Sequence, residues 1–169
     1  MKALAPLLNE MRAAGAVTDY ALFGAVAQMR YTEAVATLDV DVLVGLPESD
    51  RIDVLSEIYR FCADRGFQAE GEAIRVGSWP VQFVPAFSEL TVAAMTEADT
   101  ADFEGAPLRV VRPAYLAVIA LSVGRSKDFA RVLALLESEC VTADEIARLA
   151  DRFGLSSAWQ RFAARFLDG

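Results

Sequence analysis

Two aspartates stand in the otherwise apolar segment VATLDVDVLVGL, which covers residues 35–46. In a strand, the i,i+2 spacing of Asp39 and Asp41 places both carboxylates on the same face of the sheet. Two neighbouring carboxylates repel each other and cost free energy to desolvate, unless they face a cation. Magnesium prefers carboxylate oxygens and bridges them to substrate phosphates. We therefore predict a magnesium site at Asp39 and Asp41; the alternative is an inert pair at the end of a solvated edge strand.

A glycine precedes this pair. Gly24 ends one predicted strand and begins a predicted helix, whose first backbone amides suit an anion such as a triphosphate. We predict phosphate contacts from Gly24 and Ala25, although a plain strand-to-helix turn explains the glycine equally well. Thr37 either favours a β-strand or offers its hydroxyl to the metal site. A glycine turn followed by an Asp-x-Asp strand is the minimum for metal-assisted phosphoryl or nucleotidyl transfer.

A basic cluster follows Gly124. It comprises Arg125, Lys127 and Arg131, with Asp128 between them. One interpretation is a cationic wall that faces a triphosphate or an acceptor; the other is a solvated helix start with local ion pairs, which contribute little to stability. Two further arginine pairs at i,i+4 spacing are predicted to be solvated helix faces. They are Arg148/Arg152 and Arg161/Arg165.

Composition excludes several classes of chemistry. The 169 residues include no histidine and two cysteines, so Ser-His and Cys-His catalysis and imidazole metal ligands are absent. Cys62 and Cys140 lack metal-site spacing and are expected to be buried free thiols. The net charge of −8 argues against broad nucleic-acid binding. No apolar run is long enough to span a bilayer and no cleavage-site pattern is present, so we expect a cytoplasmic protein without a membrane segment.

Hydrophobic periodicity predicts a mixed α/β part followed by helices. Expected helices cover 2–14, 25–34, 52–64 (capped by Asp50) and 88–97, and then 113–123, 126–138, 142–153 and 156–167. Expected strands cover 17–24, 35–46, 67–70, 73–77, 79–83, 100–105 and 108–111. Neither a GxGxxG nor a Walker loop occurs. The predicted fold class is α/β (α+β), a mixed sheet flanked by helices, with an α/β domain at 1–111 and a helical bundle at 112–169.

The ordered set of motifs resembles a known superfamily. The stretch YALFGAVAQMRYTEAVATLDVDVLV is similar to the signature of DNA polymerase beta-like nucleotidyltransferases, a glycine turn followed by an Asp-x-Asp strand. More closely, it resembles the bacterial branch related to the abortive-infection nucleotidyltransferase toxins. The residues that match this branch are Tyr31, Ala36, Thr37, Asp39 and Asp41, and then Arg125, Lys127 and Asp128 of an Arg-x-Lys-Asp motif.

This resemblance implies a nucleotidyltransferase-like fold and magnesium-dependent transfer of a nucleotidyl group from a nucleoside triphosphate, at one metal ion or a two-ion site. Asp39 and Asp41 would bind the metal and take part in catalysis, and Lys127 would neutralise developing charge. Gly24, Ala25, Thr37, Arg125 and Lys127 would contact the nucleotide. The acceptor could be RNA, a protein or a small molecule. The active cleft is expected between the two parts of the chain.

The sequence departs from the superfamily pattern in three places. Gly24-Ala25 stands where Gly-Gly or Gly-Ser is usual, and Val35 stands where many relatives have arginine. Gln82 occupies the position of the third catalytic carboxylate, yet glutamine cannot accept the proton of an attacking hydroxyl and binds metal more weakly.

Gln82 leaves two functional hypotheses open. The prediction leans toward an enzyme, with slow or absent transfer unless another carboxylate substitutes; Glu70, Glu72 and Glu104 are the candidates. The alternative is a degenerate binding or interaction module of the toxin-antitoxin type, with a protein partner or a second copy of the chain.

Overall fold

A computed structural model describes residues 2–33, 36–48 and 53–167. Two residues of the sequence interpretation, Val35 and the proposed helix cap Asp50, lie outside the described residues. In this part of the chain no helix has both the length and the apolar character needed to cross a bilayer.

The centre of the molecule is a mixed seven-stranded sheet with the order β3-β4-β5-β2-β1-β7-β6. The strands are β1 (Asp19–Phe23), β2 (Val40–Gly45), β3 (Gln68–Glu70), β4 (Ala73–Val76), β5 (Trp79–Pro85), β6 (Asp99–Phe103) and β7 (Ala106–Val110). β2 lies between β1, to which it is antiparallel, and β5, to which it is parallel. β7 then runs parallel to β1 on the other side. The strand with the Asp-x-Asp motif is therefore central, and its backbone is paired on both edges.

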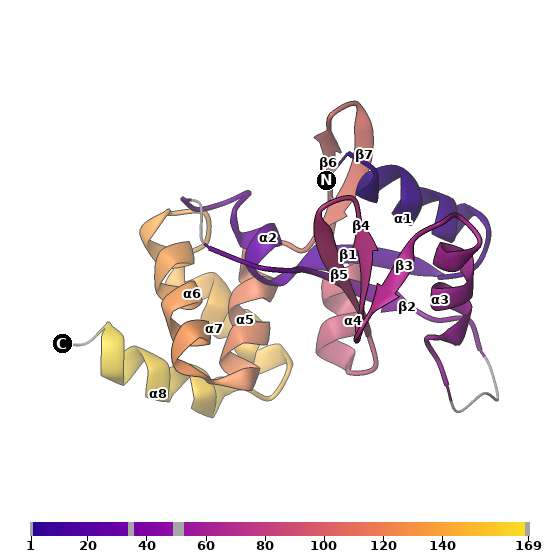
Figure 1. Ribbon diagram of the computed structural model, residues 1–169. Coiled ribbons are helices and arrows are strands. Elements are labelled where there is room, and N and C mark those ends of the chain that lie inside the picture. The colour runs from indigo at the N-terminus through magenta and orange to yellow at the C-terminus, as the bar shows by residue number, and fades with distance from the viewer. Residues whose placement is uncertain (1, 34–35, 49–52, 168–169) are drawn as a thin grey trace.

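Helices cover the sheet and form the C-terminal part. In Figure 1, α1 (Leu4–Ala13) lies above the sheet and α4 (Glu89–Thr96) below it, while α2 (Gly24–Gln28) follows β1 directly. The remaining helices are α3 (Ser56–Ala63), α5 (Pro113–Val123), α6 (Ser126–Glu137), α7 (Ala143–Arg152) and α8 (Ser156–Phe166). The last four pack together beside the sheet, on the left of Figure 1. The mixed sheet with flanking helices and a C-terminal helical part confirms the predicted fold class.

Local sequence explains where several of these helices begin. Pro113 occupies the first turn of α5, where its missing N–H is not needed. Thr142 and Glu145 form the predicted capping box of α7, with the Thr142 hydroxyl accepting from the Glu145 N–H at 3.2 Å. Ser88 caps α4 in the same way. The change from sheet to helices takes place between Val110 and Pro113.

Three element boundaries differ from the sequence prediction. The helix predicted at 25–34 ends at Gln28, and the Tyr31 N–H closes a turn on the Gln28 carbonyl at 2.8 Å. The Tyr31 hydroxyl is then held by the carbonyl of Val111, a contact across 80 residues. The strand predicted from residue 35 is observed from Val40, so Asp39 lies directly before it. The helix predicted from residue 52 is observed from Ser56.

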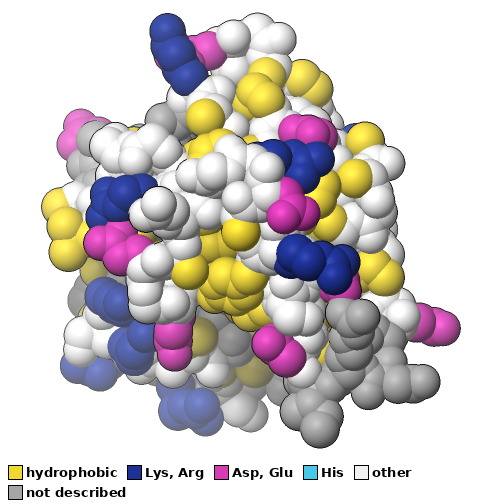
Figure 2. Space-filling model, turned by 45° about the vertical axis from the view of Figure 1, so that its right-hand side comes forward, with side chains coloured by type: hydrophobic (Ala, Val, Ile, Leu, Met, Phe, Trp, Pro, Cys, Tyr) yellow, Lys and Arg dark blue, Asp and Glu magenta, His cyan; other side chains and the backbone are white. Residues whose placement is uncertain are grey.

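Charge is unevenly distributed over the surface despite the net charge of −8. On the face that Figure 2 shows, acidic and basic side chains are interspersed around recessed hydrophobic ones, and a group of Lys and Arg side chains gathers at the lower left. A strongly acidic chain can therefore still present local basic surfaces.

Candidate functional site

A small cleft brings the predicted glycine turn, one motif aspartate and the basic cluster together. Its volume is about 180 Å³. It lies where β1 and β2 meet α5 and α6, so the sheet forms one wall and the C-terminal helices the other. The cleft is lined by Phe23, Gly24, Asp41, Leu116, Ile119, Ala120, Val123, Arg125, Lys127, Asp128 and Arg131. This is the location expected for the active cleft, between the α/β part and the helices.

Gly24 and Asp41 touch across the β1–β2 pair. Phe23 is the register partner of Asp41 in this antiparallel ladder, so the chain turns into α2 directly beside the Asp41 carboxylate. Gly24 has φ +69°, in the left-handed region, and a Cβ built on it would overlap the Asp41 side chain. Glycine is required here both by backbone conformation and by the close approach of the carboxylate.

Asp39 acts electrostatically on Asp41, but Asp39 precedes β2, so the strand geometry assumed in the shared-face prediction does not extend to it. The pKa of Asp41 is raised above its usual 3.8, first by burial and then by the charge of Asp39, although Arg131, Lys127 and Arg125 act in the opposite direction. A half-buried carboxylate near a second carboxylate is the arrangement that a bound cation relieves. Asp39 is half-buried and is not among the residues that line the cleft.

The Thr37 hydroxyl holds Asp39. It lies 3.0 Å from the Asp39 carbonyl oxygen and 3.3 Å from Asp39 Oδ1. Thr37 lies before β2 and not in a strand, which excludes the simple β-former interpretation. A threonine hydroxyl bonded to a nearby carbonyl favours local turns over a ladder, and this explains why the strand begins later than predicted.

Gln82 lies beside Asp41 on the neighbouring strand. The two residues are register partners in the parallel β2–β5 pair, so their side chains leave the sheet on the same face. Val81 and Phe83 are buried on either side of the half-buried Gln82, which confirms the alternation predicted from the sequence. The amide therefore occupies the position next to Asp41 where the superfamily resemblance implies a third carboxylate.

The three glutamates considered as substitutes lie elsewhere. Glu70 ends β3, at the far edge of the sheet, and forms an ion pair with Arg75. Glu72 follows in the β3–β4 turn, and Glu104 lies in the β6–β7 turn at the opposite edge. With about 4.8 Å between neighbouring strands, none of these positions adjoins Asp41. Within the residues that the structure describes, no group of three or more His, Cys, Asp or Glu side chains could hold a metal ion.

The start of α6 forms a compact ion-pair network. Asp128 is 1% exposed, and its Oδ2 accepts from the Arg125 backbone N–H at 3.1 Å and from Arg125 Nε at 2.7 Å. Arg131 approaches the other oxygen at 3.6 Å. Burial alone would raise the pKa of Asp128, yet these hydrogen bonds and charges hold it below 3.8. Arg125 and Arg131 therefore form the predicted local ion pairs with Asp128 and also line the cleft.

Lys127 lies in the same turn of α6 but is not paired with Asp128. Its side chain is exposed and lines the cleft, and it makes no ion pair or hydrogen bond with the other described residues. Its charge lowers the pKa of Asp41. Lys127 is therefore the cation of α6 that is best able to neutralise an incoming anion.

Sequence reasoning missed Gln28. This residue is 4% exposed at the end of α2, and its Oε1 accepts from Arg131 Nε at 3.1 Å, a contact across 103 residues. The bond joins the helix after the glycine turn to α6 and hence the two walls of the cleft. The available signal was a lone amide in the apolar stretch AVAQM, which needs a partner when buried.

Cysteine chemistry is not part of this site. Cys62 is a buried free thiol, as predicted, and burial raises its pKa to about 11. Cys140 is half-buried, and its thiol lies 3.3 Å from the Leu135 carbonyl. At neutral pH the Cys62 thiol is protonated and is a poor nucleophile.

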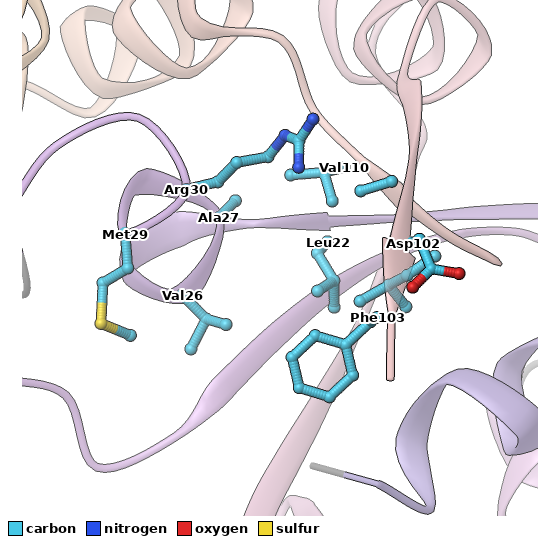
Figure 3. A pocket seen from close by; sticks show the side chains of 10 residues that line it. Leu22, Val26, Ala27, Met29, Arg30, Asp102, Phe103 and Val110 are labelled. Atoms are coloured by element: carbon cyan, nitrogen blue, oxygen red, sulfur yellow. The ribbon is translucent and has the colours of Figure 1, made fainter. Parts of the chain in front are cut away.

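A larger apolar hollow lies on the opposite side of α2. Its volume is about 430 Å³. Figure 3 shows Val26, Met29 and Arg30 of the α2 region on one side, and Asp102 and Phe103 of β6 on the other. It contains neither the glycine turn nor the motif aspartates. The chemically equipped site is therefore the smaller cleft at Asp41.

Solved structures with the same architecture are nucleotidyltransferase-like proteins. The chain superposes on an antigenic nucleotidyltransferase-like protein from Paracoccidioides brasiliensis with a TM-score of 0.56, at 13% identity, over 92% of this chain and 89% of that one. It superposes on ANT(2'')-Ia in complex with adenylyl-2''-tobramycin with a TM-score of 0.53, at 12% identity, over 96% and 97% of the two chains. The solution structure of the same antibiotic-resistance factor gives 0.50.

These similarities establish a nucleotidyltransferase-like fold, as the sequence resemblance predicted. No protein-family model matches the sequence, and no protein of curated function matches it. The relation to the abortive-infection branch stays a prediction, as do the two-domain division at residue 111 and the roles of the site residues.

Proposed function

We propose that this chain binds a nucleoside triphosphate with magnesium in the cleft at Asp41 and transfers its nucleotidyl group to an acceptor. One observation carries this proposal: Asp41 on the sheet and Lys127 on α6 line the same cleft, in a nucleotidyltransferase-like fold. ANT(2'')-Ia, which has a similar fold, was solved with an adenylylated small molecule. This supports nucleotidyl transfer as the reaction and a hydroxyl-bearing small molecule as one acceptor class.

The residues present fit a magnesium ion. Asp39 and Asp41 supply two carboxylates, and the pKa of Asp41 is raised first by burial and then by the charge of Asp39, whose repulsion a divalent cation would offset. Magnesium commonly uses one or two protein carboxylates and completes its shell with water and substrate phosphates. When bound, the ion would polarise the phosphates and reduce their charge.

The chain's own residues would position the reactants. In the transfer step, an acceptor hydroxyl oxygen forms a bond to the α-phosphorus, the bond to the bridging oxygen breaks, and pyrophosphate leaves with that electron pair. Lys127 stabilises the negative charge on the triphosphate, with Arg125 contributing beside it. The backbone of Gly24 lies against the Asp41 side chain, and the amides of Gly24 and Ala25 would contact the phosphates from there.

The proton of the attacking hydroxyl has no carboxylate acceptor at Gln82. It must pass to water or to Asp41, the motif carboxylate that lines the cleft. Slow transfer is therefore expected. The position of Gln82, directly beside Asp41, is the specific observation that favours a second function, a module that binds nucleotide without turnover.

The biological setting is proposed from the motifs alone. The Arg-x-Lys-Asp and Thr-x-Asp-x-Asp matches support a cytoplasmic, bacterial, toxin-antitoxin-like protein that works with a protein partner or a second copy of itself. In the structure, Asp128 of the first motif accepts a hydrogen bond from Arg125 at the start of α6. The Thr37 hydroxyl of the second motif donates to the Asp39 carbonyl. These roles are compatible with a shared scaffold.

The test combines binding and turnover. Thermal unfolding is measured with each nucleoside triphosphate, with and without magnesium, and transfer is followed with a labelled triphosphate and a panel of acceptors. A magnesium-dependent stabilisation with label transfer supports the enzyme; stabilisation without transfer supports the binding module. A melting curve that responds to no nucleotide would contradict both.

A further inference from the structure

A second hollow adjoins the Asp41 cleft on the C-terminal side. Its volume is about 460 Å³, and it lies between the end of α5 and the side of α8. Val123 lines both hollows, and Gly124 of this one is followed directly by Arg125 of the cleft. A molecule bound here would therefore sit next to the proposed nucleotide.

The charged groups of this hollow are all basic. Arg161 and Arg165, one turn apart on α8, line it together with Ser122, and no Asp or Glu is among its lining residues. Neither arginine makes an ion pair or hydrogen bond within the described ranges, while the Arg165 guanidinium lies 5.0 Å from the Phe166 ring centre. Both arginines are exposed, as predicted for a solvated helix face, and they also border this hollow.

An apolar floor completes the site. Phe129, Phe162 and Phe166 pack against one another with ring centres 5.1–5.9 Å apart, and all three line the hollow. Planar guanidinium groups above such a floor present paired N–H donors that match phosphate oxygens. Stacking of Arg165 on Phe166 restricts the side chain before any ligand arrives, which lowers the entropic cost of binding.

We propose that this hollow binds the acceptor, and that the acceptor is a compact, phosphate-bearing small molecule. This inference rests on the proposed function for the acceptor role, whereas the binding itself does not depend on it. The size is in the range of small-molecule pockets. A long nucleic acid fits less well, because 24 acidic against 16 basic side chains repel an extended polyanion. The basic lining equally disfavours a polycationic acceptor.

The experiment measures binding to the full chain by calorimetry. The phosphate-bearing probes are glucose 6-phosphate, fructose 1,6-bisphosphate and AMP, with spermine as a cationic probe and a 12-nucleotide RNA as a polymeric one. Each titration is done with and without magnesium and α,β-methylene-ATP. We expect saturable binding of at least one phosphate-bearing small molecule, retained when the ATP analogue is present, and weaker binding of spermine and RNA.

The variant Arg161→Gln/Arg165→Gln should weaken that binding by about tenfold or more, because two charge-assisted contacts are lost. The control Arg148→Gln/Arg152→Gln makes the same charge change at i,i+4 spacing on α7 and should leave the affinity within about twofold. Arg161 and Arg165 are exposed, so folding should survive. A second variant, Arg161→Lys/Arg165→Lys, retains the charge but loses the planar donors. Its affinity for the probe should lie between those of the Arg161→Gln/Arg165→Gln variant and the control.

Three outcomes would overturn the proposal: no binding of any phosphate-bearing small molecule, equal loss in both double variants, or tighter binding of spermine or RNA. The outcomes also separate the two proposals. Probe binding together with no binding of the ATP analogue and no transfer would sink the nucleotidyl-transfer function but keep the anion site. Transfer that is unchanged in the Arg161/Arg165 variant would keep the function and remove the acceptor site.

Discussion

Asp41 on β2 and Gln82 on β5 are register partners in a parallel pair of strands, with their side chains on one face of the sheet. This places an uncharged amide beside Asp41, at the position where the superfamily resemblance implies the third carboxylate. The balance between catalysis and binding therefore depends on one position whose backbone is already in place.

Replacing Gln82 with Asp should create or raise nucleotidyl transfer, because the new carboxylate can hold metal and accept a proton beside Asp41. Triphosphate affinity should change little in the presence of magnesium. The measurement is label transfer to the acceptor panel by both forms. Gln68→Asp, on exposed β3, makes the same charge change away from the cleft and should have no effect. Rapid transfer by the unmodified chain, not raised by the substitution, would show that Gln82 is not limiting.

The double substitution Asp39→Asn/Asp41→Asn should stabilise the metal-free chain and abolish stabilisation by nucleotide with magnesium. Because the pKa of Asp41 is raised, its contribution to stability is fully present below pH 3.8 and is lost as the pH rises through the raised value. The advantage of the variant should therefore grow from acid to neutral pH. Thermal unfolding across that range tests this, with Asp64→Asn/Asp144→Asn as the control. An undiminished magnesium-nucleotide shift in the variant would rule out the metal site.

Lys127→Gln should weaken triphosphate binding on the order of tenfold and nucleoside binding much less, since the lost contact is to phosphate charge. Calorimetry with ATP and with adenosine provides the comparison. Lys2→Gln removes the same charge from an exposed position outside the cleft. Equal losses for both ligands would mean that Lys127 acts on folding or on the base.

Gly24→Ala should destabilise the chain more than Gly154→Ala. Both glycines have φ +69°, so each alanine costs about 1–2 kcal/mol for the left-handed backbone. At Gly154 nothing lies within 4 Å of the added Cβ, whereas at Gly24 the Cβ meets Asp41, which adds roughly 1–3 kcal/mol. Chemical denaturation gives both values. Adding Asp41→Ala to Gly24→Ala should remove the extra destabilisation that Gly24→Ala shows over Gly154→Ala. If the free-energy effects of Gly24→Ala and Asp41→Ala simply add, Asp41 does not contact residue 24.

Asp128→Asn should lower the free energy of unfolding by about 1–3 kcal/mol, because the buried side chain loses charge-assisted bonds to Arg125 and Arg131. The pKa of Asp128 is lowered, so its stabilisation is present above pH 3.8 and is lost as the pH falls through the lowered value. The gap between the two forms should then close in acid. Asp144→Asn at the start of α7 is the exposed control. If the difference in free energy of unfolding persists at low pH, the substitution acts through packing and not through charge.

The sequence predicted the parts of the site that depend on local pattern. Alternation placed Gln82 opposite Val81 and Phe83, and the Gly24 turn follows β1 as predicted, whereas the strand with Asp41 begins only at Val40. Contacts between distant segments were not predictable. The Tyr31 hydroxyl donates to the Val111 carbonyl, and Arg131 donates to Gln28. No local periodicity encodes either contact.

The pairing of β1 with β7 has a consequence for synthesis of the chain. Leu22 pairs with Val110, and Asn9 of α1 donates to the Pro107 carbonyl at 2.7 Å, so the first helix and strand are completed by residues almost a hundred positions later. A ribosome must have produced the chain through Val110 before the outer edge of β1 is covered. Until then a buried, apolar strand offers a free backbone edge to any neighbour. Nascent chains whose β7 has not yet left the ribosome should therefore depend on chaperones, whereas chains stalled far enough along to expose β7 should depend on them less.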